Sequence, residues 1–89
     1  MTQKVELYTK QTCPFCIFAK RLLDQKAVSY TEIKIDLEPE RRNEMIERSD
    51  GGWTVPQIFI SDEPIGGYDN LSRLEQQGKL DELLTHSVS

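Results

Sequence analysis

Hydrophobic and polar residues alternate along two short stretches of the chain. In residues 4–8, Val5 and Leu7 fall on one side of an extended backbone. In residues 30–37 one side carries Thr31, Ile33, Ile35 and Leu37. A period of two residues is typical of a strand that buries one face. Both stretches are therefore predicted to be strands.

Two further strands are predicted in the second half of the chain. Residues 57–60 form a short continuous apolar run, which is typical of a central strand covered on both faces. Residues 61–64 predict a turn, and Ile65 is expected in a short antiparallel partner strand.

A helix is predicted directly after the first strand. Its apolar side chains recur at the spacing of one helical face, namely Phe15, Phe18, Ala19, Leu22 and Leu23. Lys20, Arg21 and Asp24 fall on the opposite face. Strand, helix and strand in this order form a βαβ unit, in which a right-handed crossover pairs the two strands in parallel.

The remaining helices flank the last two strands. Pro39 opens a highly charged helix, interpreted as solvated, that ends near residues 49–52. Leu71 and Leu74 begin another, which Gly78 interrupts. A last amphipathic turn or two carries Leu80, Leu83 and Leu84. The order β-α-β-α-β-β-α predicts an α/β fold, a four-stranded mixed sheet flanked by three to four helices.

Composition limits the classes of function. The 89 residues, 37% hydrophobic and 29% charged, are ordinary for one globular domain, expected at residues 1–89. A net charge of −4 argues against nucleic acid as a partner. No apolar run approaches membrane-spanning length, and the opening Met-Thr-Gln-Lys shows no signal peptide, so we expect a cytoplasmic protein without a membrane partner.

The only two cysteines lie where the first strand gives way to the first helix. Pro14 fits the first helical position, where its missing N–H costs no hydrogen bond. Cys13 is then the N-cap, facing the unpaired amides of Phe15 and Cys16 and the positive end of the helix dipole. Both effects favour the thiolate, so Cys13 is the expected nucleophile. Cys16 is placed to attack a mixed disulfide on Cys13, which would close a redox-active disulfide.

Metal binding and structural bonding explain this pair less well. A structural zinc site needs four ligands, and the chain adds only His86 to the two cysteines. A disulfide that closes so short a loop would constrain little of the unfolded chain. Cysteines used only as small core residues would not require Pro14. Thiol–disulfide exchange without a metal is therefore the preferred interpretation.

Two segments are candidates to complete the site. Pro56 is expected at the first position of the third strand, as an ordinary trans proline or as a cis proline that turns Val55 toward the cysteines. Gly66 and Gly67, with Asp69 at a helix start, form either a carboxylate-binding turn or a plain turn capped by Asp69.

Three motifs occur in an order and at a spacing that resemble the glutaredoxins: Cys13-Pro14-Phe15-Cys16, Thr54-Val55-Pro56 and Gly66-Gly67-Tyr68-Asp69. The resemblance covers essentially the whole chain and is closest to the small bacterial dithiol type. It implies a thioredoxin-like fold and a glutathione-dependent thiol–disulfide oxidoreductase, a monomer with glutathione as co-substrate and no metal. Its partners would be glutathionylated or disulfide-bonded proteins such as ribonucleotide reductase.

The resemblance also implies a glutathione site. Cys13 would form the mixed disulfide with glutathione, and the backbone of Val55, before a cis Pro56, would pair with its cysteine moiety. Tyr68 and Asp69 would hold the γ-glutamyl end. The other expected contacts are Lys10, near the thiolate and the glycyl carboxylate, Phe15 as an aromatic wall, Thr54 and Gly67.

Two departures from the family pattern bear on this site. Residues 50–53 precede Thr54 where relatives often have a shorter loop with a basic residue, so the grip on the glycyl carboxylate is open, with Arg48 or Lys10 as replacements. Trp53 in this loop is interpreted as a half-buried aromatic. Asn70 replaces an acidic residue common in relatives.

Two rival functions stay open beside the redox enzyme. One is an iron–sulfur carrier, in which two chains bridge a cluster through Cys13 and two glutathiones; Pro14 disfavours it, since carriers often lack that proline. The other is a glutathione-independent redoxin reduced by thioredoxin reductase, which the Gly67-Tyr68-Asp69 segment disfavours.

Overall fold

The computed structural model describes residues 4–85, so His86 lies outside the described residues. The strands are β1 (Val5–Thr9), β2 (Thr31–Lys34), β3 (Gln57–Ile60) and β4 (Glu63–Gly66). The helices are α1 (Pro14–Gln25), α2 (Arg42–Arg48), α3 (Tyr68–Gln76) and α4 (Leu80–Thr85), with a 3₁₀ turn at Pro39–Arg41 before α2. The predicted order of elements is confirmed.

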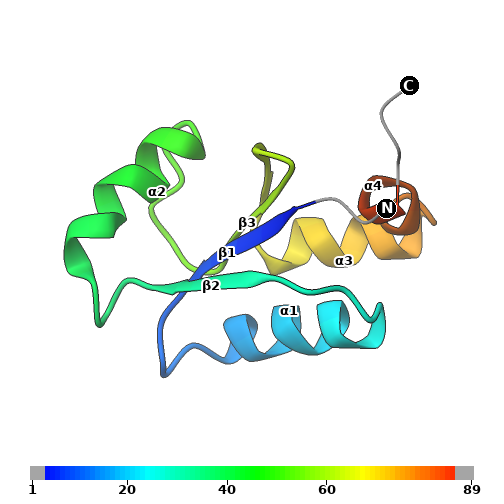
Figure 1. The fold of residues 1–89 in the computed structure, drawn as a ribbon, viewed down its shortest axis with the longest axis horizontal. Coiled ribbons are helices and arrows are strands. Elements are labelled where there is room, and N and C mark those ends of the chain that lie inside the picture. The colour runs from blue at the N-terminus through cyan, green and yellow to red at the C-terminus, as the bar shows by residue number, and fades with distance from the viewer. Residues whose placement is uncertain (1–3, 86–89) are drawn as a thin grey trace.

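The strands form one mixed sheet in the order β2-β1-β3-β4. β1 pairs in parallel with β2 and antiparallel with β3, and β3 pairs antiparallel with β4. α1 and α3 lie side by side, whereas α2 lies apart from them, across the sheet (Figure 1). Because β1 and β3 run in opposite directions, the end of β1 and the start of β3 meet at the same edge of the sheet. The cysteine loop and the segment before β3 are brought together there.

The core has two parts, one on each face of the sheet. The part under α1, α3 and α4 comprises Val5, Leu7, Ala19, Leu23, Val28, Ile58, Ile60, Leu71, Leu80 and Leu84. The part under α2 comprises Tyr8, Ile33, Ile35, Met45 and Phe59. Val5 and Leu7 share one face of β1, as predicted, but β1 buries both of its faces, because Tyr8 packs in the part under α2. Among residues 4–85, no helix has the length and apolar character needed to cross a membrane.

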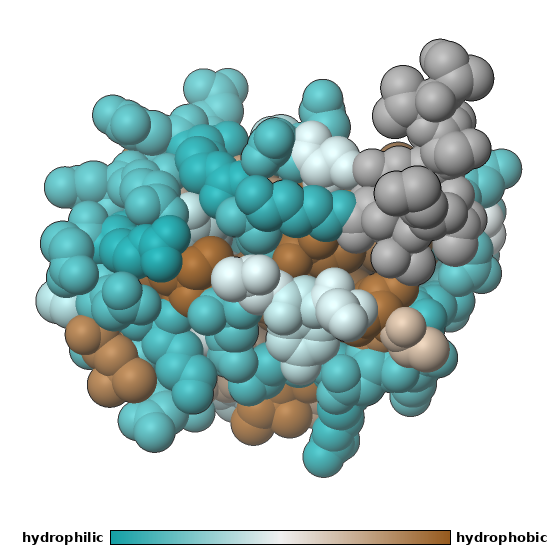
Figure 2. Space-filling model, in the orientation of Figure 1, coloured by the Kyte–Doolittle hydropathy of each residue, from teal (hydrophilic) through white to brown (hydrophobic). Residues whose placement is uncertain are grey.

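The second strand is shorter than the alternation predicts. It ends at Lys34, because the backbone amides of Leu37 and Glu38 donate to the Lys34 carbonyl at 3.1 and 2.9 Å and turn the chain. Leu37 is consequently 64% exposed instead of lying beside Ile35. Hydrophilic residues cover most of the face shown in Figure 2, and apolar residues are exposed among them.

The buried stripe of α1 also differs from the one predicted. Its buried residues are Cys16, Ala19 and Leu23, whereas Phe15 and Phe18 are 58% and 42% exposed. The buried stripe is shifted toward Cys16, because the Cys16 side chain is on the buried side of α1. Phe15 and Phe18 were predicted on the apolar face of the helix, but both lie outside its buried part.

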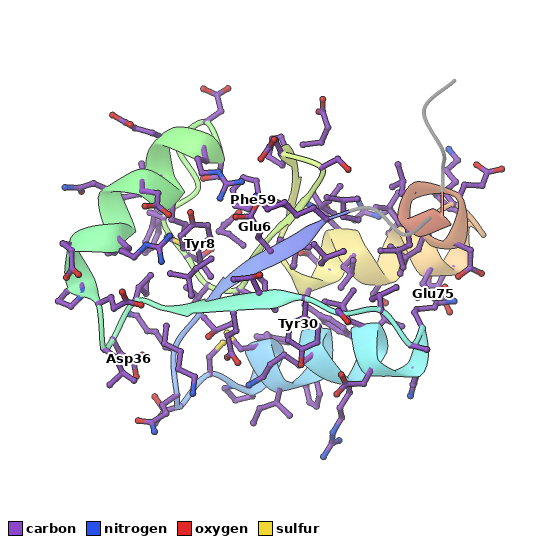
Figure 3. All side chains as sticks on the ribbon, in the orientation of Figure 1. Glu6, Tyr8, Tyr30, Asp36, Phe59 and Glu75 are labelled. Atoms are coloured by element: carbon purple, nitrogen blue, oxygen red, sulfur yellow. The ribbon has the colours of Figure 1, made fainter. Side chains whose placement is uncertain are left out.

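The charged helix α2 is not a purely solvated face. Arg48 donates to both carboxylate oxygens of Glu6, at 2.8 and 3.3 Å, and to the hydroxyl of Tyr8 at 2.9 Å. Its guanidinium lies 4.2 Å from the centroid of the Phe59 ring. The Tyr8 hydroxyl in turn donates to Glu44. Glu6, Tyr8 and Phe59 gather between α2 and the sheet (Figure 3), so this network holds the helix in place.

We expect Arg48→Lys to lower the free energy of unfolding by about 1–2 kcal/mol. An ammonium cannot reproduce the two-pronged contact with Glu6 or the stacking on Phe59. Chemical denaturation measures the change. Arg42→Lys is the matched control on the same helix, because exposed Arg42 makes a single 3.4 Å contact with the Trp53 carbonyl. Equal stability of the two variants would contradict the structural role of Arg48.

Candidate active site

Cys13 is the N-cap of α1, as predicted. Its backbone is extended, with φ −98° and ψ 110°, and Pro14 occupies the first turn. The backbone amide of Cys16 donates to the Cys13 sulfur, with 3.2 Å between nitrogen and sulfur. A helix N-terminus thus points at this sulfur, where its amides stabilise negative charge.

The two cysteines differ in exposure and in acidity. Both are free thiols, but Cys13 is partly exposed whereas Cys16 is 1% exposed. Burial and the hydrogen bond with Cys13 raise the pKa of Cys16 to about 12. Cys16 therefore stays protonated at neutral pH, and Cys13 is the sulfur that a disulfide in solution can reach.

The segment before β3 lies against Cys13. The Cys13 thiol donates to the carbonyl oxygen of Val55, with 3.6 Å between sulfur and oxygen. The peptide bond between Val55 and Pro56 is cis, which decides between the two isomers left open by the sequence. The buried side chain of Gln57 donates to the Thr54 carbonyl at 2.9 Å, and this contact helps to fix the backbone of the segment before β3.

Sequence reasoning assigned Gln57 only to an apolar strand. The one available signal was its polarity, because a polar residue in a buried run must find a partner within the protein.

The start of α3 faces the same edge of the sheet. Gly67 is its N-cap and provides no side chain to satisfy the first amides, and Asp69 lies within the first turn. The predicted cap at Asp69 is therefore wrong, and the helix begins at Tyr68, one residue before Asp69. Gly66 has φ +107°, a conformation that favours glycine.

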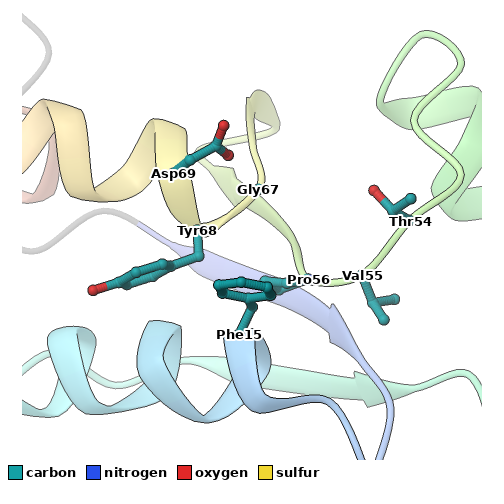
Figure 4. A pocket seen from close by; sticks show the side chains of 7 residues that line it. All are labelled: Phe15, Thr54, Val55, Pro56, Gly67, Tyr68 and Asp69. Carbon is teal, nitrogen blue, oxygen red and sulfur yellow. The ribbon is translucent and has the colours of Figure 1, made fainter.

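A pocket of about 500 Å³ opens between α1, the segment before β3 and the start of α3 (Figure 4). It is lined by Phe15, Thr54, Val55, Pro56, Gly67, Tyr68 and Asp69. The Phe15 and Tyr68 rings stack at one side, with centroids 6.4 Å apart. The residues that the family resemblance nominated for glutathione, apart from Lys10, thus meet around one cavity beside Cys13.

Neither cation nominated for the glycyl carboxylate, Lys10 or Arg48, lines the pocket. Lys10 is exposed, and its carbonyl accepts the Cys13 amide at 3.4 Å. Arg48 is bound to Glu6 and Tyr8 beneath α2, so its proposed replacement role is wrong. Trp53 is 66% exposed instead of half-buried. Arg42, which the sequence did not single out, reaches the Trp53 carbonyl.

Within the described part of the chain, no group of three or more His, Cys, Asp or Glu side chains is placed to hold a metal ion.

Comparisons with known proteins all identify the same family. The family model described as Glutaredoxin matches residues 5–65. Glutaredoxin 3 of Escherichia coli is 55% identical over 80 residues, which cover 90% of this chain and 95% of that protein. A probable glutaredoxin of Synechocystis is 54% identical over 81 residues, covering 91% of this chain and 74% of the relative.

A solved structure extends the comparison to the fold. The crystal structure of a buckwheat glutaredoxin–glutathione complex superposes with a TM-score of 0.86 at 30% identity and covers 93% of this chain and 77% of that one. The sheet and its helices therefore form a thioredoxin-like fold of the kind that glutaredoxins have.

We expect the two thiols to differ strongly in alkylation by iodoacetamide. At neutral pH, Cys16 in Cys13→Ser should react about a hundredfold or more slowly than Cys13 in Cys16→Ser, because its raised pKa leaves little thiolate. The rate at Cys16 should keep rising as the pH is raised above neutral, because burial raises the pKa of Cys16 also without the Cys13 thiol. Mass spectrometry measures both rates, and unfolding in guanidinium should equalise them. Equal rates in the folded variants would refute the assigned asymmetry.

Proposed function

The chain belongs to the glutaredoxin family, and from its site we propose that it is a glutathione-dependent disulfide oxidoreductase that reduces protein–glutathione mixed disulfides and protein disulfides. The observation that supports this most is the pocket beside Cys13, which combines an aromatic wall, an uncapped helix start and the Asp69 carboxylate. Glutathione offers a thiol, two carboxylates and an ammonium group to these partners.

The first half-reaction uses Cys13 alone. Its thiolate attacks the glutathione sulfur of a protein–glutathione disulfide, so that a bond forms between Cys13 and glutathione. The bond to the protein sulfur breaks, and this sulfur leaves with the electron pair and takes up a proton. A second glutathione then attacks the glutathione sulfur on Cys13, which releases glutathione disulfide and regenerates the thiolate.

The pocket would hold glutathione along its length. The Val55 backbone would pair with its cysteine moiety, between the Phe15 ring and the Thr54–Pro56 segment. The γ-glutamyl carboxylate would accept from the first amides of α3, at Tyr68, where the helix dipole favours an anion. Its ammonium would lie against Asp69. Lys10 would approach the glycyl carboxylate from the loop before Cys13.

Protein disulfides would require both cysteines. Cys13 would attack the substrate disulfide, and Cys16 would resolve the intermediate by closing the disulfide with Cys13. Two molecules of glutathione would reduce this pair again. We place the reaction in the cytoplasm, carried out by a monomer, with disulfide-bonded enzymes such as ribonucleotide reductase among its substrates.

The first test is reduction of a glutathionylated peptide by glutathione, coupled to glutathione reductase. Cys13→Ser should lose about a thousandfold or more in rate, because the nucleophile is gone. Cys16→Ser should stay within about threefold of the parent on the peptide, since the first half-reaction does not use Cys16, but should lose activity on a protein disulfide. Turnover of the parent no faster than free glutathione alone would refute the proposal.

A second test concerns the γ-glutamyl end. Asp69→Asn should raise KM for glutathione about fivefold to tenfold with kcat within about twofold, because a charge-assisted contact to the ammonium is lost. Glu82→Gln is the matched control, an acidic residue in the first turn of α4. Steady-state kinetics against glutathione separates the two constants. An unchanged KM in Asp69→Asn would show that the ammonium group of glutathione does not contact Asp69.

A further inference from the structure

A cluster of three side chains lies one helical turn beyond Cys16. The Lys20 ammonium is 3.1 Å from a carboxylate oxygen of Glu32 on β2. The hydroxyl of Thr9, on β1, donates to the same oxygen at 2.7 Å. Side chains from α1, from the edge strand β2 and from the central strand β1 therefore meet at the Glu32 carboxylate, near the cysteine pair.

The strand register explains why the cluster faces α1. β1 and β2 pair in parallel with Leu7 opposite Glu32, so Glu32 shares the face on which Leu7 packs under α1. Thr9, two residues beyond Leu7, lies on that face too and is fully buried. Lys20 follows Cys16 by four residues, a spacing that stacks two side chains on one side of a helix.

This arrangement restrains the Lys20 ammonium. Its side chain is 30% exposed and that of Glu32 is 21% exposed, so the pair is shielded from solvent more than a surface ion pair. A lysine without such partners would extend into water, where its charge is screened. The contact with Glu32, whose carboxylate is held by the Thr9 hydroxyl, keeps a positive charge near Cys16 instead.

A positive charge near Cys16 would assist the step in which Cys16 resolves a mixed disulfide. Cys16 must become a thiolate to attack, yet burial, the largest cause of its raised pKa, opposes this ionisation. Two contacts lower the pKa of Cys16 instead: a backbone hydrogen bond at Lys10 and the positive charge of Lys20. From β2 and the residue before it, Glu32 and Tyr30 face the same ammonium. Lys34 faces Glu32.

We propose that Lys20, held by Glu32 and Thr9, stabilises the Cys16 thiolate in the resolving step of disulfide reduction. The Cys16 thiol gives its proton to solvent, and its sulfur forms a bond with the Cys13 sulfur. The bond between Cys13 and the substrate sulfur breaks, and the substrate sulfur leaves with the electron pair and takes up a proton. The cysteine pair is oxidised as the substrate disulfide is reduced. This inference rests on the resolving role of Cys16 in the proposed function.

The test uses the aromatic disulfide DTNB in stopped-flow single turnover, without glutathione. Attack by Cys13 releases one equivalent of coloured thiolate, and attack by Cys16 on the resulting mixed disulfide releases the second. Lys20→Gln should leave the first phase unchanged and slow the second about threefold at neutral pH. Raising the pKa of Cys16 by about one unit lowers its thiolate fraction about tenfold. The more basic thiolate is also a stronger nucleophile, so the rate falls by less than tenfold. The pH profile of the second phase should shift upward.

Two variants separate charge from structure. Lys20→Arg keeps the cation and should restore the second phase to within about twofold of the parent. Lys26→Gln is the matched control, a lysine at the other end of α1 that pairs with Glu75 at 2.6 Å and Asp81 at 2.9 Å; it should change neither phase. An unchanged second phase in Lys20→Gln, or equal slowing in Lys26→Gln, would overturn the proposal.

The outcome is distinguishable from a failure of the proposed function. Loss of the second equivalent in Cys16→Ser establishes that Cys16 resolves, and release of two equivalents by that variant would refute both the resolving role and this inference. The assay uses DTNB and no glutathione. The effect of Lys20 on the second phase could therefore be measured even if the protein did not use glutathione.

Discussion

The antiparallel pairing of β1 with β3 is the constraint on which the site depends. It aligns Tyr8 with Gln57, so the residues that follow β1 and those that precede β3 emerge at one edge of the sheet. Cys13 thereby meets the Val55 carbonyl, although 42 residues separate them. β4 runs antiparallel to β3 and returns the chain to the same edge, where the start of α3 adds the third wall of the pocket.

One helix gives two identical side chains different chemistry. Cys13 caps the helix from outside, where backbone amides and solvent both reach its sulfur. Cys16 lies one turn later and is enclosed between α1 and the sheet, where burial opposes ionisation. The asymmetry sets the order of events, since the accessible sulfur must react first and the enclosed one only when a mixed disulfide is already within reach.

Periodicity and turn residues, which are local signals, predicted the order of the elements along the chain and the cap at Cys13. The resemblance of three motifs to a known family nominated the residues that line the pocket. Prediction from the sequence failed where tertiary packing decides. Phe15 and Phe18 match a helical apolar face as well as Ala19 and Leu23 do, but only packing shows which stripe is buried. Arg48 was assigned to solvent because a charge run cannot reveal a Glu6 partner 42 residues away. The isomer of Pro56 likewise depends on contacts that no local pattern contains.

The exposed phenylalanines follow from the same geometry. Keeping two large rings in contact with water forgoes hydrophobic stabilisation, so their position calls for a compensating interaction. Phe15 stacks on Tyr68, and Phe18 packs against both rings at centroid distances of 6.0 and 5.8 Å. This aromatic cluster joins α1 to the start of α3 at one side of the pocket. It therefore sets the separation between the cysteine helix and the helix start that would bind a carboxylate, which neither helix could fix alone.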